Sequence, residues 1–212
     1  MNNRRQKEIP SPVIRRVSKY LIHIERLEEK GRKWVSSKDL ADALGLTRST
    51  VRMDVSYLRV SGVSKRGYAV EKFRKTVAKF LGVHKGCKVI IVGAGNLGRA
   101  LALHKAFAQK GFKIGGIFDS DSGLLNEKVG SLRIRSMDTL SQVVRRQKIR
   151  LAIIAVPAQA AQEVADKLVQ AGVRGLLNLA CADLIVPNSV AVIESRIAMD
   201  LRELCCAVRM RE

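Results

Sequence analysis

The sequence is poor in the residues that build disulfide frameworks, metal centres and catalytic sets. Its 212 residues include only four cysteines and three histidines. Without C-x-x-C spacing or a secretion signal, the cysteines indicate neither disulfides nor a zinc site. No Ser–His–Asp set or metal cluster is recognisable either, so we expect no catalytic residue and no metal. The cysteines are expected to be reduced packing residues, with a thiol redox switch as the alternative.

Long apolar segments are also lacking. The longest runs, such as "LAIIAVPA", are far shorter than the roughly 20 residues that a membrane-spanning helix needs. No signal-peptide pattern opens the chain. With 47% hydrophobic residues, an ordinary value for a soluble globular protein, the chain is expected to be cytoplasmic and to have no membrane partner.

Acidic residues are scarce relative to basic ones. The chain carries 39 Lys and Arg against 19 Asp and Glu, a net charge of +20. The excess is densest in residues 1–86, which hold 21 basic and 8 acidic side chains, whereas residues 87–212 hold 18 and 11. This distribution predicts a polyanionic partner for the first part. A basic surface that is merely solvated is the alternative.

The first part has the pattern of a helix-turn-helix. An amphipathic helix is predicted between Ser11, as its N-cap, and Gly31, with Pro12 at the first helical position. In "SKDLADALGLTRSTVRMDVSYLRVSG", Ala41 is small enough for two helices to approach, and Gly45 can adopt the left-handed backbone of a sharp turn. Two short helices around such a turn indicate a helix-turn-helix, and a plain αα-hairpin is the alternative.

The second of these short helices and the segment after it are expected to contact DNA. Arginine reads guanine bidentately, and hydroxyl groups suit phosphates and base edges. The segment "VSGVSKRGYAV" is expected to be a two-stranded wing with a basic tip. The DNA-contacting residues predicted from this winged helix are Arg48, Ser49, Arg52, Ser56, Tyr57, Lys65 and Arg66.

From Lys88 onward, apolar strands alternate with amphipathic helices. This alternation predicts an α/β fold of the Rossmann type, a doubly wound parallel sheet covered on both faces. We expect three parts, a winged-helix domain with its linker (1–86), a Rossmann domain (87–194) and a C-terminal helix (195–212). The strands are expected at 88–92, 112–118, 132–134, 150–156, 174–180 and 190–194, and the helices between them at 97–109, 137–147 and 158–170.

The stretch "VGAGNLG" has the G-x-G-x-x-G spacing of a dinucleotide-binding turn, between a predicted strand and a predicted helix. Gly93 would allow the tight turn, Gly95 the approach of a pyrophosphate, and Gly98 close packing of the helix on the strand. The helix N-terminus would favour the anion. A glycine turn kept only for packing is the alternative.

Other strand ends belong to the same predicted crevice. Asp119, 21 residues after Gly98, would accept hydrogen bonds from the ribose 2′-hydroxyl, and Asp121 could share that role. The ends of the fourth and fifth strands, with Val156, Pro157 and Asn178, would line the nicotinamide half. Asn178 could bond a carboxamide or could instead tie down the backbone of a loop.

The sequence as a whole resembles the Rex family of bacterial redox-sensing transcriptional repressors. The resemblance runs nearly end to end and is carried by stretches such as "IPSPVIRR", "VSSKDLADALGLT", "VRMDVSY", "VGAGNLGRAL" and "GFKIGGIFDSD". It implies a homodimer with two winged helices on palindromic operator DNA, NAD(H) as the cofactor of each Rossmann domain, and a C-terminal helix swapped between subunits. NADH would release the DNA, and NAD⁺ would compete for the same site.

The resemblance also assigns individual residues. Ala94, Asn96 and Leu97 would hold the pyrophosphate together with the three glycines. Arg16 matches an arginine that links the two domains in the family.

Three positions depart from the family pattern. His104 and Arg196 stand where the partners of that arginine, a tyrosine and an aspartate, are expected, and Cys181 replaces a proline. Because two arginines repel each other, the position of Arg196 predicts that a carboxylate such as Glu194 or Asp200 intervenes.

The function predicted is that of a dimeric repressor whose operator affinity follows the NADH/NAD⁺ ratio. Two alternatives stay open. One is a regulator that answers to a CoA ester or to NAD⁺ alone, and the other is a small NAD-dependent oxidoreductase, against which the lack of a substrate domain argues.

Overall fold

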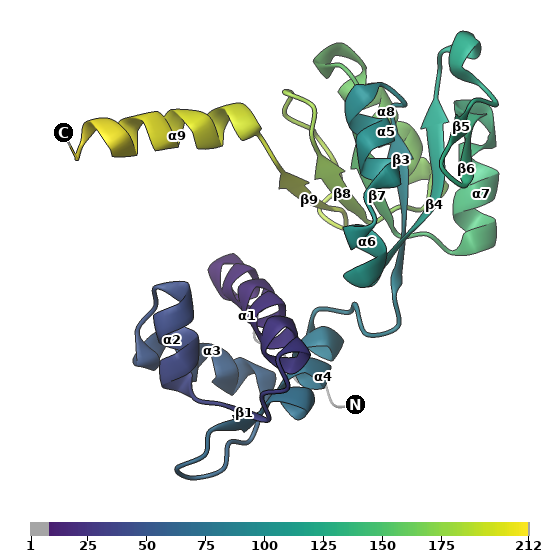
Figure 1. Ribbon diagram of the computed structural model, residues 1–212. Coiled ribbons are helices and arrows are strands. Elements are labelled where there is room, and N and C mark those ends of the chain that lie inside the picture. The colour runs from purple at the N-terminus through teal and green to yellow at the C-terminus, as the bar shows by residue number, and fades with distance from the viewer. Residues whose placement is uncertain (1–8, 212) are drawn as a thin grey trace. The chain divides into compact units, whose positions relative to one another are not determined.

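The computed structural model of the chain describes residues 9–211. These residues separate into two compact units, one ending at Lys85 and the other beginning at Gly86 (Figure 1). Among the described residues, no helix combines the length and the apolar character that crossing a membrane requires.

The first unit consists of four helices and one short antiparallel strand pair around a single core. The bounds are α1 (Ser11–Glu29), β1 (Trp34–Val35), α2 (Ser37–Leu44), α3 (Arg48–Leu58), β2 (Tyr68–Ala69) and α4 (Val70–Phe80). Helix α1 begins one residue earlier than predicted, with Pro10 at the N-cap and no side-chain cap, so Ser11 does not cap it. The apolar side chains that recur at helical spacing in α1, such as Val17 and Ile24, are fully buried in this core.

The predicted helix-turn-helix is present as α2 and α3. Ser36 and Asp39 form a reciprocal capping box at the start of α2. Gly45 ends α2 with φ of 65°, in the left-handed region where glycine is strain-free. Thr47 then caps α3, because its hydroxyl oxygen accepts a hydrogen bond from the Thr50 N–H (3.1 Å). The turn predicted at Gly45 is therefore observed, with a capped helix on each side of it.

The segment predicted as a two-stranded wing is arranged differently. Val63 and Gly67 form a single antiparallel bridge around a tight turn. Strand β2 does not continue this hairpin, because Tyr68 and Ala69 pair with Val35 and Trp34 of β1. The partner strand thus lies before the helix-turn-helix in the chain, and local sequence patterns do not reveal such a distant pairing.

The second unit is built on a seven-stranded sheet of order β5-β6-β4-β3-β7-β8-β9. All neighbours are parallel except β5 and β6, which form an antiparallel edge. The predicted doubly wound class is confirmed, with β5 as an extra strand. The strand bounds are β3 (Cys87–Val92), β4 (Phe112–Asp119), β5 (Lys128–Val129), β6 (Leu132–Ser136), β7 (Leu151–Ile154), β8 (Gly175–Asn178) and β9 (Ala191–Glu194).

Helices cover the two faces of this sheet unequally. The helix bounds are α5 (Asn96–Leu103), α6 (Ala106–Gln109), α7 (Leu140–Gln147), α8 (Ala158–Ala171) and α9 (Ile197–Arg209). One helix predicted over 97–109 is interrupted, since His104 leaves the helical backbone region (ψ 100°) and separates α5 from α6. Helices α7 and α8 bury one face, and α5 and α6 pack on the other.

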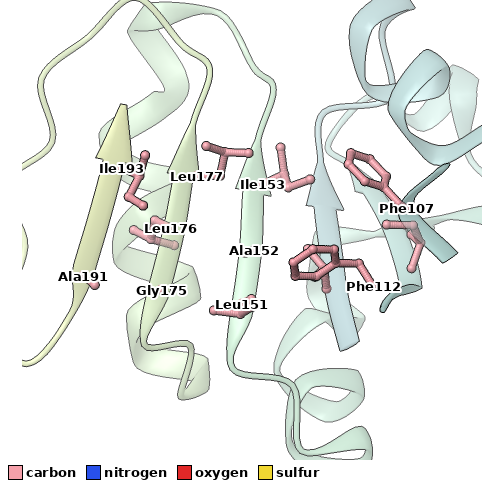
Figure 2. A pocket seen from close by; sticks show the side chains of 12 residues that line it. Phe107, Phe112, Leu151, Ala152, Ile153, Gly175, Leu176, Leu177, Ala191 and Ile193 are labelled. Atoms are coloured by element: carbon pink, nitrogen blue, oxygen red, sulfur yellow. The ribbon is translucent and has the colours of Figure 1, made fainter. Parts of the chain in front are cut away.

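The second face is open beyond α6. A cavity of about 350 Å³ extends from β4 and β3 over β7, β8 and β9, and its lining is almost entirely apolar. Figure 2 shows Leu151, Ile153, Leu177 and Ile193 along these neighbouring strands, with Phe107 of α6 at one side. This cavity lies on the sheet face rather than at the strand ends, so it is separate from the predicted dinucleotide crevice.

Candidate functional sites

The glycine turn sits where the order of the strands reverses, between β3 and β7. Gly93 follows β3 with φ of 103°, and a Cβ there would lie 2.2 Å from the Ala155 carbonyl oxygen. A Cβ on Gly98 would lie 1.8 Å from the Gly93 carbonyl oxygen. Both distances are impossible for real atoms, so the tight turn and the close approach of α5 require glycine at these two positions.

Gly95 has no such packing role. Its backbone is extended (φ −70°), and a Cβ added there would meet no atom within 4 Å. Gly95 is the N-cap of α5 and offers no side-chain hydrogen bond to the first free N–H groups of that helix. The exposed residues Asn96 and Leu97 open the helix beside this space, and Ala94 is buried behind it. The turn is therefore a candidate anion site, because the N-terminus of a helix offers free N–H groups and the positive end of its dipole.

Asp119 lies directly beside the turn. Its Oδ2 accepts a hydrogen bond from the Ala94 N–H (2.6 Å), and its Oδ1 accepts one from the Asp121 N–H (2.9 Å). Each carboxylate oxygen retains a second acceptor position, so a ribose hydroxyl can still donate to it. Asp121 instead accepts from the Gly123 N–H (2.8 Å) in its own loop. The structure thus brings Asp119, rather than Asp121, to the glycine turn.

The residues after β7 and β8 complete this edge of the sheet. Val156 and Pro157 follow β7 and lead into α8, with Pro157 at its N-cap. Asn178 is fully buried at the end of β8. Its Nδ2 donates to the Ala182 carbonyl (2.8 Å) and its Oδ1 accepts from the Ala180 N–H (3.0 Å). Of the two roles considered for Asn178, the structure shows the second, in which its side chain ties down the backbone of a loop.

Arg196 is held by carboxylates, as the sequence predicts. Its Nη2 bonds Asp183 and, at 2.6 Å, the Oε2 of Glu194. The hydrogen bond with Asp183 raises the pKa of Arg196 further above its ordinary value. Glu194 was one of the two carboxylates considered, whereas Asp183 was missed because it lies on a different loop. His104 packs its ring 5.4 Å from that of Phe107.

The outer face of α3 carries the predicted DNA-contacting residues. Arg48, Ser49, Arg52 and Ser56 are exposed on it. Tyr57 differs, because it is half-buried and packs against the core of the first unit. The remaining predicted residues, Lys65 and Arg66, are exposed in the turn after α3, and the Arg66 guanidinium lies 5.6 Å from the centre of the Trp34 ring.

Two residues of α3 were missed by the sequence interpretation. Met53 is 63% exposed on the outer face, beside Arg52. Asp54 is 1% exposed and accepts both a bidentate bond from Arg16 (2.7 and 2.8 Å) and a bond from the Tyr20 hydroxyl (2.7 Å). The signal was available, since Asp54 lies between the core residues Val51, Val55 and Leu58 in helical spacing. In the structure, Arg16 of α1 holds α3 in place through its bonds to Asp54.

These features define a class of protein. A helix-turn-helix with a basic outer face is joined to a Rossmann-type sheet, whose glycine turn leaves space beside the N-terminus of a helix. Such a chain is a DNA-binding regulator with a nucleotide-binding domain.

Comparison with known proteins narrows this class. Family models match residues 84–182 ("CoA binding domain") and residues 8–56 ("Putative DNA-binding protein N-terminus"). The chain is 39% identical to the redox-sensing transcriptional repressor Rex of Carboxydothermus hydrogenoformans, covering 95% of this chain and 97% of the relative. It is 40% identical to Rex 1 of Thermotoga maritima, covering 93% and 95%. The chain belongs to the Rex family of redox-sensing transcriptional repressors.

Solved structures agree with this assignment. The Rex-family repressor RSP in complex with β-NAD⁺ and operator DNA superimposes with a TM-score of 0.89 at 32% identity, covering 96% of this chain and 94% of that chain. RSP in complex with β-NADH gives a TM-score of 0.85 at 31% identity, covering 97% of each chain.

Proposed function

We propose that this chain is a transcriptional repressor that binds operator DNA through α3 and senses the NADH/NAD⁺ ratio through its Rossmann-type unit. The observation that carries the proposal is the empty space beside Gly95, bounded by the uncapped N-terminus of α5 and by Asp119. The relative RSP, solved with β-NAD⁺ and operator DNA, shares this fold over nearly the whole chain.

In this proposal, different residues of the chain bind the pyrophosphate, the ribose and the nicotinamide of NAD(H). The N–H groups around Gly95, Asn96 and Leu97 would hold the pyrophosphate, with Gly93, Ala94 and Gly98 shaping the turn behind them. Asp119 would accept bonds from the adenosine ribose. The nicotinamide, whose oxidation state carries the signal, would lie beside Val156 and Pro157, with Asn178 keeping the neighbouring loop in place through the bonds to Ala180 and Ala182.

The coupling between the two ligands follows from linkage. A nucleotide releases DNA only if it binds the DNA-incompetent conformation more tightly, and DNA then weakens nucleotide binding by the same factor. In this proposal the chain acts as a regulator rather than as an enzyme, because the nucleotide is bound and read without being consumed.

A homodimer formed through α9 is part of the proposal. This helix has no buried residue, and Ile197, Leu201, Leu204 and Val208 form an exposed apolar stripe at heptad spacing along it. The same unit leaves an apolar cavity open over β7 to β9. Unpartnered apolar surfaces of this kind are typical of obligate interfaces, and a second copy of the chain supplies both complementary surfaces. Two recognition helices would then face a palindromic operator.

The direct test is a titration of DNA binding against nucleotide. Fluorescence anisotropy of a labelled operator duplex is expected to show release of the purified chain by NADH and competition by NAD⁺. Arg48→Gln with Arg52→Gln should abolish specific binding, whereas Arg15→Gln with Arg32→Gln, on exposed positions outside α3, should retain it. Equal DNA affinity at saturating NADH and NAD⁺, or release by coenzyme A instead, would refute redox sensing.

A further inference from the structure

The amino ends of the parallel strands carry a row of basic side chains. Lys88 and Lys113 are direct partners in the register of β3 and β4. Arg150 and Arg174 immediately precede β7 and β8 at the same level of the sheet, where the Arg174 N–H donates to the Arg150 carbonyl (2.9 Å). Lys148 lies in the turn that leads to Arg150. These five residues are called the amino-edge cluster below.

The amino-edge cluster is exposed and is not neutralised by the protein. All five side chains are exposed, and none forms a salt bridge within the part of the chain that the structure describes. Arg150 and Arg174 donate only to backbone carbonyls. Neighbouring strands are about 4.8 Å apart, so the row from β4 to β8 extends about 14 Å. Like charges held this close repel one another unless an anion binds among them.

Five of the ten described acidic residues of the second unit lie at the opposite edge of the sheet. They lie at or after the carboxyl ends of β4, β6, β8 and β9. These residues are Asp119, Asp121, Asp138, Asp183 and Glu194. Carboxylates thus occur at the nucleotide edge, where Asp183 and Glu194 pair with Arg196, whereas the cations of the amino-edge cluster have no such partners among the described residues.

Stabilisation of helix ends accounts for only part of this arrangement. Cations favour helix C-termini, and Arg150 indeed donates to the carbonyl of Gly172, which caps α8 (3.4 Å). Lys88 and Lys113 are not explained in this way, because they stand at the beginnings of strands.

We propose that the amino-edge cluster is a second contact surface for duplex DNA, which binds the phosphate backbone without reading bases. A linear row of cations matches a linear array of phosphates, and duplex DNA carries one negative charge per roughly 1.7 Å of its axis. Lys88 is the second residue of β3, the first strand after the linker residues Lys85 and Gly86. The inference rests on the proposed DNA binding, to which it adds a sequence-independent component from the second unit.

The test compares two matched triple variants of the full chain. Lys88→Gln, Lys113→Gln and Lys148→Gln remove three edge charges. Lys105→Gln, Lys128→Gln and Lys167→Gln remove three exposed charges elsewhere on the same unit. Binding to an operator duplex with long flanks is measured by anisotropy from low to moderate salt. The slope of log K against log[salt] is expected to fall in magnitude by at least about one in the edge variant, since each phosphate contact contributes about 0.9. The control variant is expected to keep the wild-type slope.

A second measurement uses the wild-type chain and so does not depend on the folding of any variant. Duplex DNA is expected to protect Lys88, Lys113 and Lys148 from acetylation more than Lys105, Lys128 and Lys167, as read by mass spectrometry. Equal slopes for the two variants or equal protection of the two lysine sets overturns the edge contact alone. Protection by heparin but not by DNA assigns the surface to another polyanion and also overturns it. A wild-type chain that binds no duplex at all refutes the proposed function instead.

Discussion

Substitution of Asp54 should weaken the attachment of α3 to α1. Its carboxylate is buried and accepts three hydrogen bonds, two of them from the Arg16 guanidinium. Asp54→Asn leaves that guanidinium without its charge partner, and because Arg16 is partly exposed we expect a loss of about 2–3 kcal/mol in the free energy of unfolding. Urea denaturation checks this. Asp42→Asn, at an exposed position of α2, should change the free energy by less than about 0.5 kcal/mol.

The hydrogen-bonded group of Arg16, Tyr20 and Asp54 makes the free energy of unfolding depend on pH in the alkaline range. Burial, reinforced by the hydrogen bond to Asp54, raises the pKa of Tyr20 well above its ordinary value. The unfolded chain therefore releases this proton first, at about pH 10, and folding becomes less favourable as the pH rises beyond that value. We expect Tyr20→Phe to lower stability at neutral pH and to flatten its decline between pH 9 and 11. An identical decline in both proteins would exclude Tyr20 as the cause.

Two glycines at the junction of β3 and α5 have different roles. Gly98 is needed for packing, whereas Gly95 borders open space. In Gly98→Ala the new Cβ would lie 1.8 Å from a carbonyl oxygen, so α5 must shift, and stability should fall by about 2 kcal/mol or more. In Gly95→Ala the Cβ meets no protein atom, so stability should change by about 1 kcal/mol at most. Calorimetric titration should nevertheless show that Gly95→Ala lowers NADH affinity at least tenfold, because the methyl group occupies the space assigned to the pyrophosphate. Unchanged affinity would refute that assignment.

The elements that the sequence predicted well are those whose signals are local. The G-x-G-x-x-G turn lies between a strand and a helix in an unbroken stretch, and the Gly45 turn joins two helices that are adjacent in the sequence, so spacing alone was sufficient. Pairings between distant segments were not predictable in this way. Strand β2 pairs with β1 across the whole helix-turn-helix, and Asp54 meets Arg16 from another helix. In the candidate nucleotide site, the pattern located Asp119 but left the role of Asn178 undecided, because that depends on where Ala180 and Ala182 place their backbone atoms.

The proposed dimer can be tested through the exposed apolar residues of α9. The stripe on α9 includes Leu201 and Leu204, which are 56% and 58% exposed. Leu201→Gln with Leu204→Gln should dissociate the proposed dimer, because the variant no longer buries those side chains, each of which contributes about 1.5–3 kcal/mol when fully buried. Light scattering coupled to size exclusion should report a monomer near 23.4 kDa.

A neighbouring pair of substitutions provides the matched control for α9. Arg202→Gln with Glu203→Gln places two glutamines in the same turns of the helix and, like the leucine variant, leaves the net charge unchanged. This variant should remain dimeric, because its side chains lie off the apolar stripe. Since two linked recognition helices bind a palindrome far more tightly than one, the leucine variant should also lose operator affinity by at least about a hundredfold while its NADH affinity is retained. A leucine variant that remains dimeric would exclude α9 as the dimer contact.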